Sequence, residues 1–406
     1  MTVIDRALSV VGLHRKSMAW TLSGGRPQPV GGAGLAGPVV TARSSMGLSA
    51  VWACSNLISG VNSSLPHELR RRTGDSSRVE ENHPLHAVIN DSPNYDQTPV
   101  DFWDFMNLSI ELWGNAYARI ARNDAGRIIA LYPVQPDAMS VQRAPDGREI
   151  LYRWTDEGRA WERGSRDVLH IRGPGGSALG GMSTLTFGVN TFSAALAAEQ
   201  AASGMFANGL LSSVVIAFKE WMTPEQRAIT DARLAEKYMG AMNAGRPFFT
   251  EGGTEVKSLT INPKDAQMLE TRQFSIEEIC RFFQVPPVLI GHAGAATAWP
   301  TSVEQQVIMF QKFYLRRRIK RIEQAVSKQL LSAADRARGL SMRINMEGLL
   351  RGDTASRASW YQTMTQIGAM TINDVRRLEG LPPVPGGDQP RMQAQNVPIS
   401  ETEGLQ

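Results

Sequence analysis

Residues 262–306 carry the sequence NPKDAQMLETRQFSIEEICRFFQVPPVLIGHAGAATAWPTSVEQQ, which predicts two amphipathic helices joined by a loop of small residues. The first helix begins after Asn262-Pro263, and Pro286-Pro287 ends it because proline offers no amide hydrogen to a helix. The loop from Gly291 to Pro300 contains no Lys, Arg, Asp or Glu. Long helices around an uncharged loop favour a moving or channel-lining element over a catalytic one.

The second helix is the longest in the chain and is predicted to run from Ser302 to about Leu331, which is about 45 Å at 1.5 Å per residue. Its apolar residues form two stripes that lie about a third of a turn apart. The stripes are Val303, Val307, Phe310 and Tyr314, and Leu315, Ile319, Ile322 and Val326. Two faces of this helix must therefore be covered, either by the rest of the chain or by neighbouring copies of it.

The preceding part of the chain predicts an α+β fold. A first helix ends before Pro66, and Thr98 caps a later helix that has Pro99 at its first position. Alternating strands follow, with turns rich in Asn, Asp and Gly between them, at 117–122, 127–132, 139–143, 149–154 and 167–172. Because helices and strands do not alternate as in βαβ units, a mixed α+β domain is predicted.

Helices dominate from Ser183 onward. They are predicted at 183–208, 223–242, 263–284, 354–367 and 371–380, with a strand-like excursion at 248–261. The stretches before Ser45 and after Pro385 are rich in glycine, proline and polar residues, so both are predicted to be flexible.

The composition is that of an ordinary globular protein with more than one packed unit. The chain has 406 residues, of which 42% are hydrophobic and 20% charged, and its net charge of +4 is far from that of a protein that coats nucleic acid. It contains neither a run of about 18 apolar residues nor a signal peptide, so we expect neither membrane insertion nor export.

Three short motifs could carry chemistry, and each has a more ordinary interpretation. The Gly-rich stretch 173–183 lies between a strand and a helix but lacks the lysine of a P-loop, so a flexible hinge or loop is favoured over a nucleotide site. Residues 255–257 match half of a metal-dependent nuclease motif, and a charge pair on an edge strand is favoured. Glu81, His83 and His86 lack a third nitrogen or sulfur ligand, and His83 is expected to start a short helix.

The two cysteines, Cys54 and Cys280, have no CxxC partner, so neither a disulfide framework nor a zinc site is predicted, and a reducing environment is expected. No nucleophile and base can be paired by their spacing. The sequence therefore predicts no catalytic residue, no cofactor and no metal site.

One dense basic run lies in the long predicted helix. Its charges cover most of the helix circumference, so they cannot all face one groove. A solvated or intersubunit-paired face is favoured, and contact with DNA phosphates is the alternative. The run consists of Arg316, Arg317, Arg318, Lys320 and Arg321.

Six separate segments resemble the portal, or head-tail connector, proteins of tailed bacteriophages in order and spacing. They are Asn82-His83-Pro84-Leu85 with Pro93-Asn94, Trp113-Gly114-Asn115-Ala116-Tyr117, Asp167-Val168-Leu169-His170, Glu270-Thr271-Arg272 leading to Phe283 through Pro287, Ala296-Thr297 ahead of Glu304-Gln305-Gln306, and Leu378-Glu379-Gly380-Leu381-Pro382-Pro383. Any one alone is weak, whereas six in the same order are specific. Trp299-Pro300 departs from the family, which has an aromatic-Ser-Asn type of sequence there.

The resemblance implies the phage portal fold, with an α/β wing, long stem and wing helices, a small clip and a helical C-terminal crown. In chain order it implies a flexible N-terminal arm (1–45), the wing (46–222), a stem helix (223–245), the clip (246–262), a second stem helix (263–287), a tunnel loop (288–301), the long wing helix with a return strand (302–352), the crown helices (353–384) and a disordered tail (385–406).

The resemblance also implies a non-enzymatic subunit of a ring, usually of twelve copies, at the unique vertex of the capsid. The ring would nucleate procapsid assembly in the host bacterial cytoplasm, stay in the virion, and be the conduit for double-stranded DNA, without sequence specificity, during packaging and ejection. Its protein partners would be the terminase large subunit, the major capsid protein or scaffold, and head-completion or adaptor proteins.

The implied tunnel loop faces the DNA. A conduit must hold DNA weakly, because each phosphate that a fixed cation neutralises adds binding that resists sliding. The uncharged loop agrees with this requirement. Its residues are Gly291, His292, Ala293, Gly294, Ala295, Ala296, Thr297, Ala298 and Trp299.

Two other functions stay open from the sequence. One is a metal-dependent nuclease associated with phage DNA, in which Glu255 and Lys257 would act. The other is a head or adaptor component without a central channel.

Overall fold

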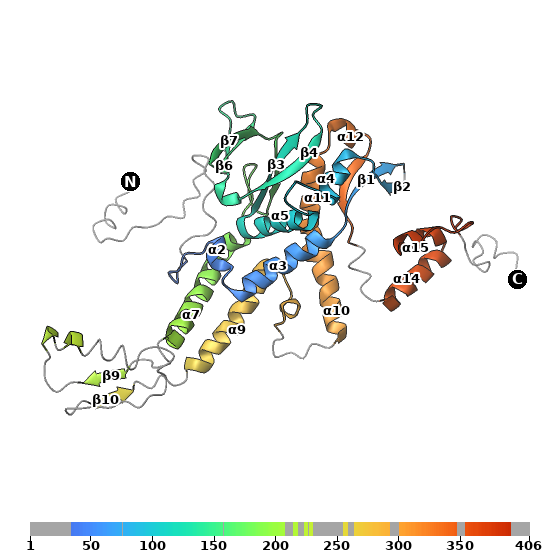
Figure 1. The fold of residues 1–406 in the computed structure, drawn as a ribbon. Helices are drawn as coiled ribbons and strands as arrows, with labels where there is room; N and C mark the ends of the chain where they lie inside the picture. Colours follow the sequence, from blue (N-terminus) through green and yellow to red (C-terminus); the bar gives the residue numbers. More distant parts are fainter. Residues whose placement is uncertain are drawn as a thin grey trace. The chain divides into compact units, whose positions relative to one another are not determined.

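The structure is a computed structural model that describes residues 34–74, 76–156, 158–207, 214–217, 223–225, 227–229, 255–258, 264–292, 300–346 and 354–390 (Figure 1). It separates into two compact units, Met1–Arg343 and Ile344–Gln406. Helices and strands mix along the first unit, so the predicted α+β class is confirmed.

The N-terminal half of the first unit contains most of the strands. Its elements are α2 (Ala42–Ser45), α3 (Ser49–Ser64), β1 (His67–Thr73), β2 (Ser76–Val79), α4 (Pro84–Asn90), α5 (Pro99–Trp113), β3 (Asn115–Arg122), β4 (Ile128–Val134), η1 (Pro136–Ala138), β5 (Ser140–Arg143), β6 (Ile150–Asp156), β7 (Arg159–Gly164) and β8 (Val168–Arg172).

Long helices follow. The elements are α6 (Thr184–Phe187), α7 (Val189–Ala207), β9 (Val214–Ala217), β10 (Glu255–Ser258), α9 (Lys264–Phe283), η3 (Pro287–Ile290), α10 (Pro300–Met309), η4 (Phe310–Leu315), α11 (Arg316–Gln329), α12 (Ala333–Ala337) and β11 (Leu340–Ile344). α7 and α9 contact each other and extend away from the sheets (Figure 1).

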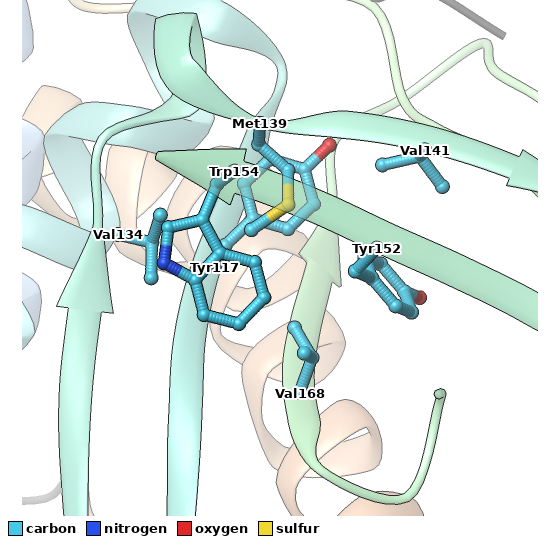
Figure 2. Packing of buried hydrophobic residues seen from close by; sticks show 7 residues of the cluster. All are labelled: Tyr117, Val134, Met139, Val141, Tyr152, Trp154 and Val168. Atoms are coloured by element: carbon cyan, nitrogen blue, oxygen red, sulfur yellow. The ribbon is translucent and has the colours of Figure 1, made fainter. Parts of the chain in front are cut away.

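Two three-stranded antiparallel sheets contribute side chains to one buried apolar cluster. One has the order β4-β3-β8 and the other β5-β6-β7. The predicted hairpins are confirmed, with Tyr117 opposite Val134 in one and Val141 opposite Tyr152 in the other. Figure 2 shows the buried cluster, which consists of Tyr117, Val134, Met139, Val141, Tyr152, Trp154 and Val168. Three of its seven side chains are aromatic, and aromatic rings bury the most apolar area per residue.

α5 lies between the β4-β3-β8 sheet and α3 (Figure 1). The predicted cap is confirmed, because the Thr98 hydroxyl accepts from the Asp101 amide and the Asp101 carboxylate accepts from the Thr98 amide. Phe102 and Trp103 are completely buried, and the Trp103 ring stacks on His67 at 4.5 Å between centroids. The cap fixes where α5 begins, and the buried rings fix which of its faces meets α3 and β1.

The strands β1, β2 and β7 were not predicted. β1 lies between β2 and β11 in a sheet of order β11-β1-β2. Its sequence HELRRRT is mostly polar, and only Leu69 carries a large apolar side chain that is fully buried. The pairing of β1 with β11 joins segments about 270 positions apart in the chain, so no local sequence pattern predicts this pairing.

Two helices predicted as continuous are interrupted. The one predicted at 183–208 is split at Gly188, where a Cβ atom would lie 2.6 Å from the Phe192 ring. The one predicted from Ser302 to Leu331 contains the π-helical segment η4 between α10 and α11. A π segment adds a residue to one turn and so changes which side chains share a face on its two sides.

The second unit contains α14 (Thr354–Gln366) and α15 (Ile372–Leu378). The predicted start of α15 is confirmed, because Thr371 and Asp374 form a reciprocal capping box. The Asn373 side chain accepts from the Val384 amide at 2.8 Å and donates to the Val384 carbonyl at 3.1 Å. These two bonds hold the proline-rich stretch after α15 against the helix.

Several predictions fall outside the described residues. They concern the arm before residue 34, most of the helix at 223–242, most of the excursion at 248–261, the loop residues 293–299, and the tail after residue 390. Among the helices that the structure describes, none is both long and apolar enough to span a bilayer.

Candidate functional site

The chain approaches the predicted tunnel loop from a firmly anchored helix end. Ile279 and Phe283 of α9 are buried, and Val285 just beyond the helix is 3% exposed. Gln284, between Phe283 and Val285, has a left-handed backbone with φ of 58°. The core therefore fixes the segment that leads into the loop.

The described part of the loop begins with a tight turn. Gly291 follows η3 with φ of 78°, and its amide donates to the carbonyls of Pro287 and Val288. The His292 amide also donates to Pro287, at 3.1 Å. A left-handed residue favours glycine because a Cβ atom would crowd the carbonyl. Of the predicted loop residues, Gly291 and His292 are thus placed at this turn, and Ala293 to Trp299 lie outside the described residues.

A buried ion pair connects the long helix to the rest of the unit. Arg318 of α11 donates from Nε to Glu111 Oε1 at 2.6 Å and from Nη2 to Oε2 at 3.1 Å. The side chains are 13% and 6% exposed. Arg318 Nη2 also donates to the carbonyl of Phe283 at 2.8 Å. One guanidinium therefore joins α11, α5 and the end of α9 directly before the predicted loop.

The electrostatics favour the charged state of this arginine. Burial alone would lower the pKa of Arg318, but the charge of Glu111 and its hydrogen bonds outweigh burial and raise the pKa above its ordinary value. Paired charges in a partly dry site are much more strongly coupled than exposed ones. Arg318 is thus held inside the subunit as part of the structure.

The other members of the basic run point in several directions. Arg316 and Arg317 are exposed, and Arg321 is half-buried, with a pKa lowered by burial and by the charges of Arg317 and Arg318. Lys320 donates to Glu323 at 2.8 Å. The structure therefore distributes the run around the helix, as the spacing predicts, and brings two members into contacts within the chain.

The π segment η4 divides apolar side chains between the core and the surface. Phe310 and Leu315 are 4% and 0% exposed, whereas Phe313 is 69% exposed. Met309, one residue before η4, is 46% exposed. π segments occur frequently at functional sites, and this one leaves two large apolar side chains on the surface beside Arg316 and Arg317.

Two of the segments that carry the family resemblance meet in space. Asn115 Oδ1 lies 2.9 Å from His170 Nε2 and accepts from the Gly181 amide at 2.7 Å. The Asn115 amide group donates to the Gly181 carbonyl at 3.0 Å. Gln329 of α11 pairs with both backbone groups of His170. This network ties β3, β8, the Gly-rich loop and the long helix together, and it explains the motifs through packing rather than chemistry.

His170 is neutral in this network. Burial, with a smaller contribution from the Arg172 charge, lowers the pKa of His170 to about 3. The hydroxyl of Tyr152 lies 3.2 Å from His170 Nδ1. With a carboxamide oxygen at Nε2, the ring donates from Nε2 and accepts at Nδ1.

The Gly-rich stretch 173–183 is a packed loop. Gly173 donates to Gly114 at 2.7 Å, and Met182 donates to Pro174 at 2.9 Å. Gly114 has φ of 75°, and a Cβ atom there would lie 2.3 Å from the Met182 backbone. The glycines permit the close approach of two backbones, so of the hinge or loop favoured from the sequence the structure shows a packed loop.

The remaining chemical motifs are placed as follows. Glu255 and Lys257 lie on β10, which pairs with β9, so the strand location is confirmed. The side chain of His83 accepts from the Leu85 amide and caps α4, as predicted. His83 Nε2 also lies 3.7 Å from Asp335. In the described ranges, no three His, Cys, Asp or Glu side chains come close enough to hold a metal ion.

One contact between two residues was not predicted from the sequence. The thiols of Cys54 on α3 and Cys280 on α9 are buried with their sulfur atoms 3.9 Å apart, and both cysteines are free. The hydrogen bond to Cys280, together with burial, raises the pKa of Cys54. The residues are 226 positions apart, so no spacing rule could have paired them.

The comparisons with known proteins cover most of the chain. The sequence model described as phage portal protein matches residues 49–380. The portal protein of Enterobacteria phage HK97 is 33% identical over 356 residues, which are 87% of this chain and 83% of that protein.

Two solved structures share the fold. A portal protein of the HK97 family from Corynebacterium diphtheriae superposes with a TM-score of 0.57 at 18% identity, covering 78% of this chain and 99% of that one. A chain from the neck of a native gene transfer agent particle, computed with C12 symmetry, superposes with a TM-score of 0.55 at 22% identity, covering 94% and 100%.

Proposed function

The chain belongs to the phage portal protein family, and from this membership we propose that its ring is the passage for double-stranded DNA during packaging and ejection. It is a portal protein that assembles into rings in phage particles. The observation that carries the proposal is the family match across residues 49–380, with 83% of the HK97 portal protein covered. The ring stands at the unique vertex of the capsid and has twelve subunits, the number that the family resemblance implies.

The parts of the chain have separate roles in this ring. Residues 46–222 form the wing, 223–245 and 263–287 the stem helices, and 246–262 the clip. Residues 302–352 form the long wing helix with its return strand, and 353–384 the crown. The compactness of residues 344–406 as a unit of their own is compatible with a separate crown.

Residues 288–301 form the tunnel loop, and Gly291 to Trp299 face the DNA. The uncharged sequence of this segment supports the assignment, because a conduit must not bind the duplex tightly. The anchoring of the preceding segment by Phe283, Val285 and the Arg318 bond to the Phe283 carbonyl supports it too. A loop that moves against DNA needs a fixed base.

The ring has several protein partners and no catalytic role of its own. It assembles in the host cytoplasm, nucleates the procapsid with the major capsid protein or scaffold, and docks the terminase large subunit. Head-completion or adaptor proteins bind later. The motor ATPase is a separate protein.

The conduit role is tested in capsids assembled with and without the protein. Capsids that contain it should protect genome-length DNA from added nuclease when terminase and ATP are present, and capsids without it should protect none. Equal protection in both preparations would contradict the proposal. Incubation of purified protein with Mg²⁺ and plasmid tests the non-enzymatic role, because cleavage that is lost on changing Glu255 or Lys257 would show a nuclease.

A further inference from the structure

The long helix presents an outward face that no part of the described chain covers. Phe313 is 69% and Met309 46% exposed. Lys312, Arg316 and Arg317 are exposed beside them and make no ion pair within the described residues. These five residues, from 309 to 317, are called the basic–apolar face. The opposite side of the helix, at Leu315 and Ile319, is already buried in the subunit.

A second surface has the complementary character. Between the end of α4 and the first turns of α5, Tyr95 is 95% and Val100 53% exposed. Four carboxylates lie among them, and none makes an ion pair in the part of the chain that the structure describes. This surface is called the acidic–apolar edge and consists of Asp91, Tyr95, Asp96, Val100, Asp101 and Asp104.

Hydrogen bonds hold the backbone of the acidic–apolar edge, although its side chains are exposed. Asn94 is buried at its centre, donates to the Leu131 carbonyl at 2.9 Å, and accepts from the amides of Asp96 and Gln97. An aromatic side chain on a fixed backbone loses little conformational entropy when a partner covers it. The backbone beside Tyr95 is thus fixed, and its exposed ring is available for contact with a partner.

We infer that the basic–apolar face of one subunit docks on the acidic–apolar edge of the next copy and closes the ring. A head-to-tail ring requires two different, mutually complementary surfaces on each subunit. One surface here carries three unpaired cations around two apolar side chains, and the other carries four unpaired carboxylates around Tyr95 and Val100. This inference deepens the proposed function and rests on ring assembly.

DNA is the less fitting occupant of the basic–apolar face. Phosphate backbones are held by cations and polar groups, whereas Phe313 and Met309 place large apolar area in the middle of this face. Apolar side chains surrounded by charges of one sign fit a protein surface of the opposite sign.

A charge-reversal cycle tests the pairing. The variant Arg316→Glu with Arg317→Glu should reduce the fraction of rings, measured by native mass spectrometry, by about tenfold or more at low salt. The variant Asp91→Lys with Asp96→Lys should reduce the fraction of rings by a similar factor. This variant leaves the Thr98–Asp101 cap of α5 intact. The fourfold variant, in which both surfaces are reversed, should regain most of the rings. The matched control Arg127→Glu with Arg148→Glu changes the same charge on exposed hairpin turns and should assemble normally.

An uncharged pair of variants completes the test. Phe313→Ala should also lower the ring fraction, while Ile129→Ala, at a side chain 55% exposed on β4, should not. Circular dichroism establishes that each variant is folded. If the wild-type protein forms no rings, the proposed function is overturned. If the wild type forms rings and the Arg316→Glu/Arg317→Glu variant forms them equally well, only this inference is overturned. If that variant forms normal rings but has lost the salt-dependent binding of duplex DNA that the wild type shows, the basic–apolar face binds DNA instead.

Discussion

Among single residues, Arg318 shows how much depends on the position of a charge. It belongs to a run of five cations, yet only its guanidinium is buried between three helices. A signal was present in the sequence, because residue 318 falls at helical spacing from the buried Leu315 and Ile322. A charge on an apolar stripe predicts a buried partner, but the sequence does not identify Glu111, which is 207 positions away.

The first prediction concerns this pair. Arg318→Ala should lower the free energy of unfolding by about 3–5 kcal/mol, because it leaves Glu111 buried without its partner. Replacing both residues, Arg318→Met with Glu111→Leu, should restore most of the loss. The exposed pair of Arg153 and Glu162 is the matched control, and Arg153→Ala should cost less than about 1 kcal/mol. Urea unfolding measures all of these values, and a small effect of Arg318→Ala alone would contradict the structural role.

The second prediction concerns pH. Burial lowers the pKa of His67 to about 4 and that of His170 to about 3. In the unfolded chain each histidine takes up a proton as the pH falls below its ordinary pKa of 6.5, whereas in the folded chain it stays neutral until a lower pH. Stability should therefore fall as the solution is acidified from pH 7 to pH 5, by about 2 kcal/mol for each histidine. His170→Gln should lose about half of this pH dependence in urea unfolding, and an unchanged dependence would contradict the buried neutral state.

At the level of elements, several local signals were read correctly, whereas the local hairpins β1–β2 and β6–β7 and the long-range pairings were missed. The caps at Thr98 and Thr371 and the two hairpins follow from short sequence patterns. The pairing of β1 with β11 and the contact of Cys54 with Cys280 join distant segments and have no local signature. The π segment was missed because periodicity alone does not reveal one inserted residue in a helix.

The third prediction concerns the crossing of β3 with the Gly-rich loop. Gly114→Ala should cost more than about 2 kcal/mol, because the new Cβ atom meets the Met182 backbone in addition to the strain of a left-handed residue. Gly126 also has φ of 75°, but nothing lies within 4 Å of its Cβ position. Gly126→Ala should therefore cost only about 1–2 kcal/mol. Equal losses in thermal or urea unfolding would show that the close approach is unimportant.

The fourth prediction concerns the predicted tunnel loop. On the proposed role of the loop, changing Gly291 and Gly294 to valine should impair DNA packaging more than ring assembly, because valine has far less backbone freedom than glycine. At Gly291 the effect comes from the backbone, since φ is 78° and nothing lies within 4 Å of a Cβ atom. Gly386→Val, at a site with φ of 73° and the same open surroundings, is the control and should package normally. Unimpaired packaging by the double variant would count against the loop assignment.

For the whole molecule, the sequence predicted the class of the fold, the family and the order of the long helices, because these depend on patterns within each segment. What it could not predict is the choice of neighbours for each surface. The exposed Phe313 and Tyr95 illustrate this, because a helical or loop pattern does not distinguish a side chain left in solvent from one covered by a second copy. In the pairing that we infer, both side chains lie in the interface between neighbouring copies.

The ring itself is tested most directly by single-particle imaging of the purified full-length protein over a range of concentrations. We expect annular particles of identical subunits around a central opening wide enough for a DNA duplex, with the tunnel loop at its narrowest point. A chain that stays monomeric at every concentration, even in the presence of its procapsid, would contradict the ring and the conduit together.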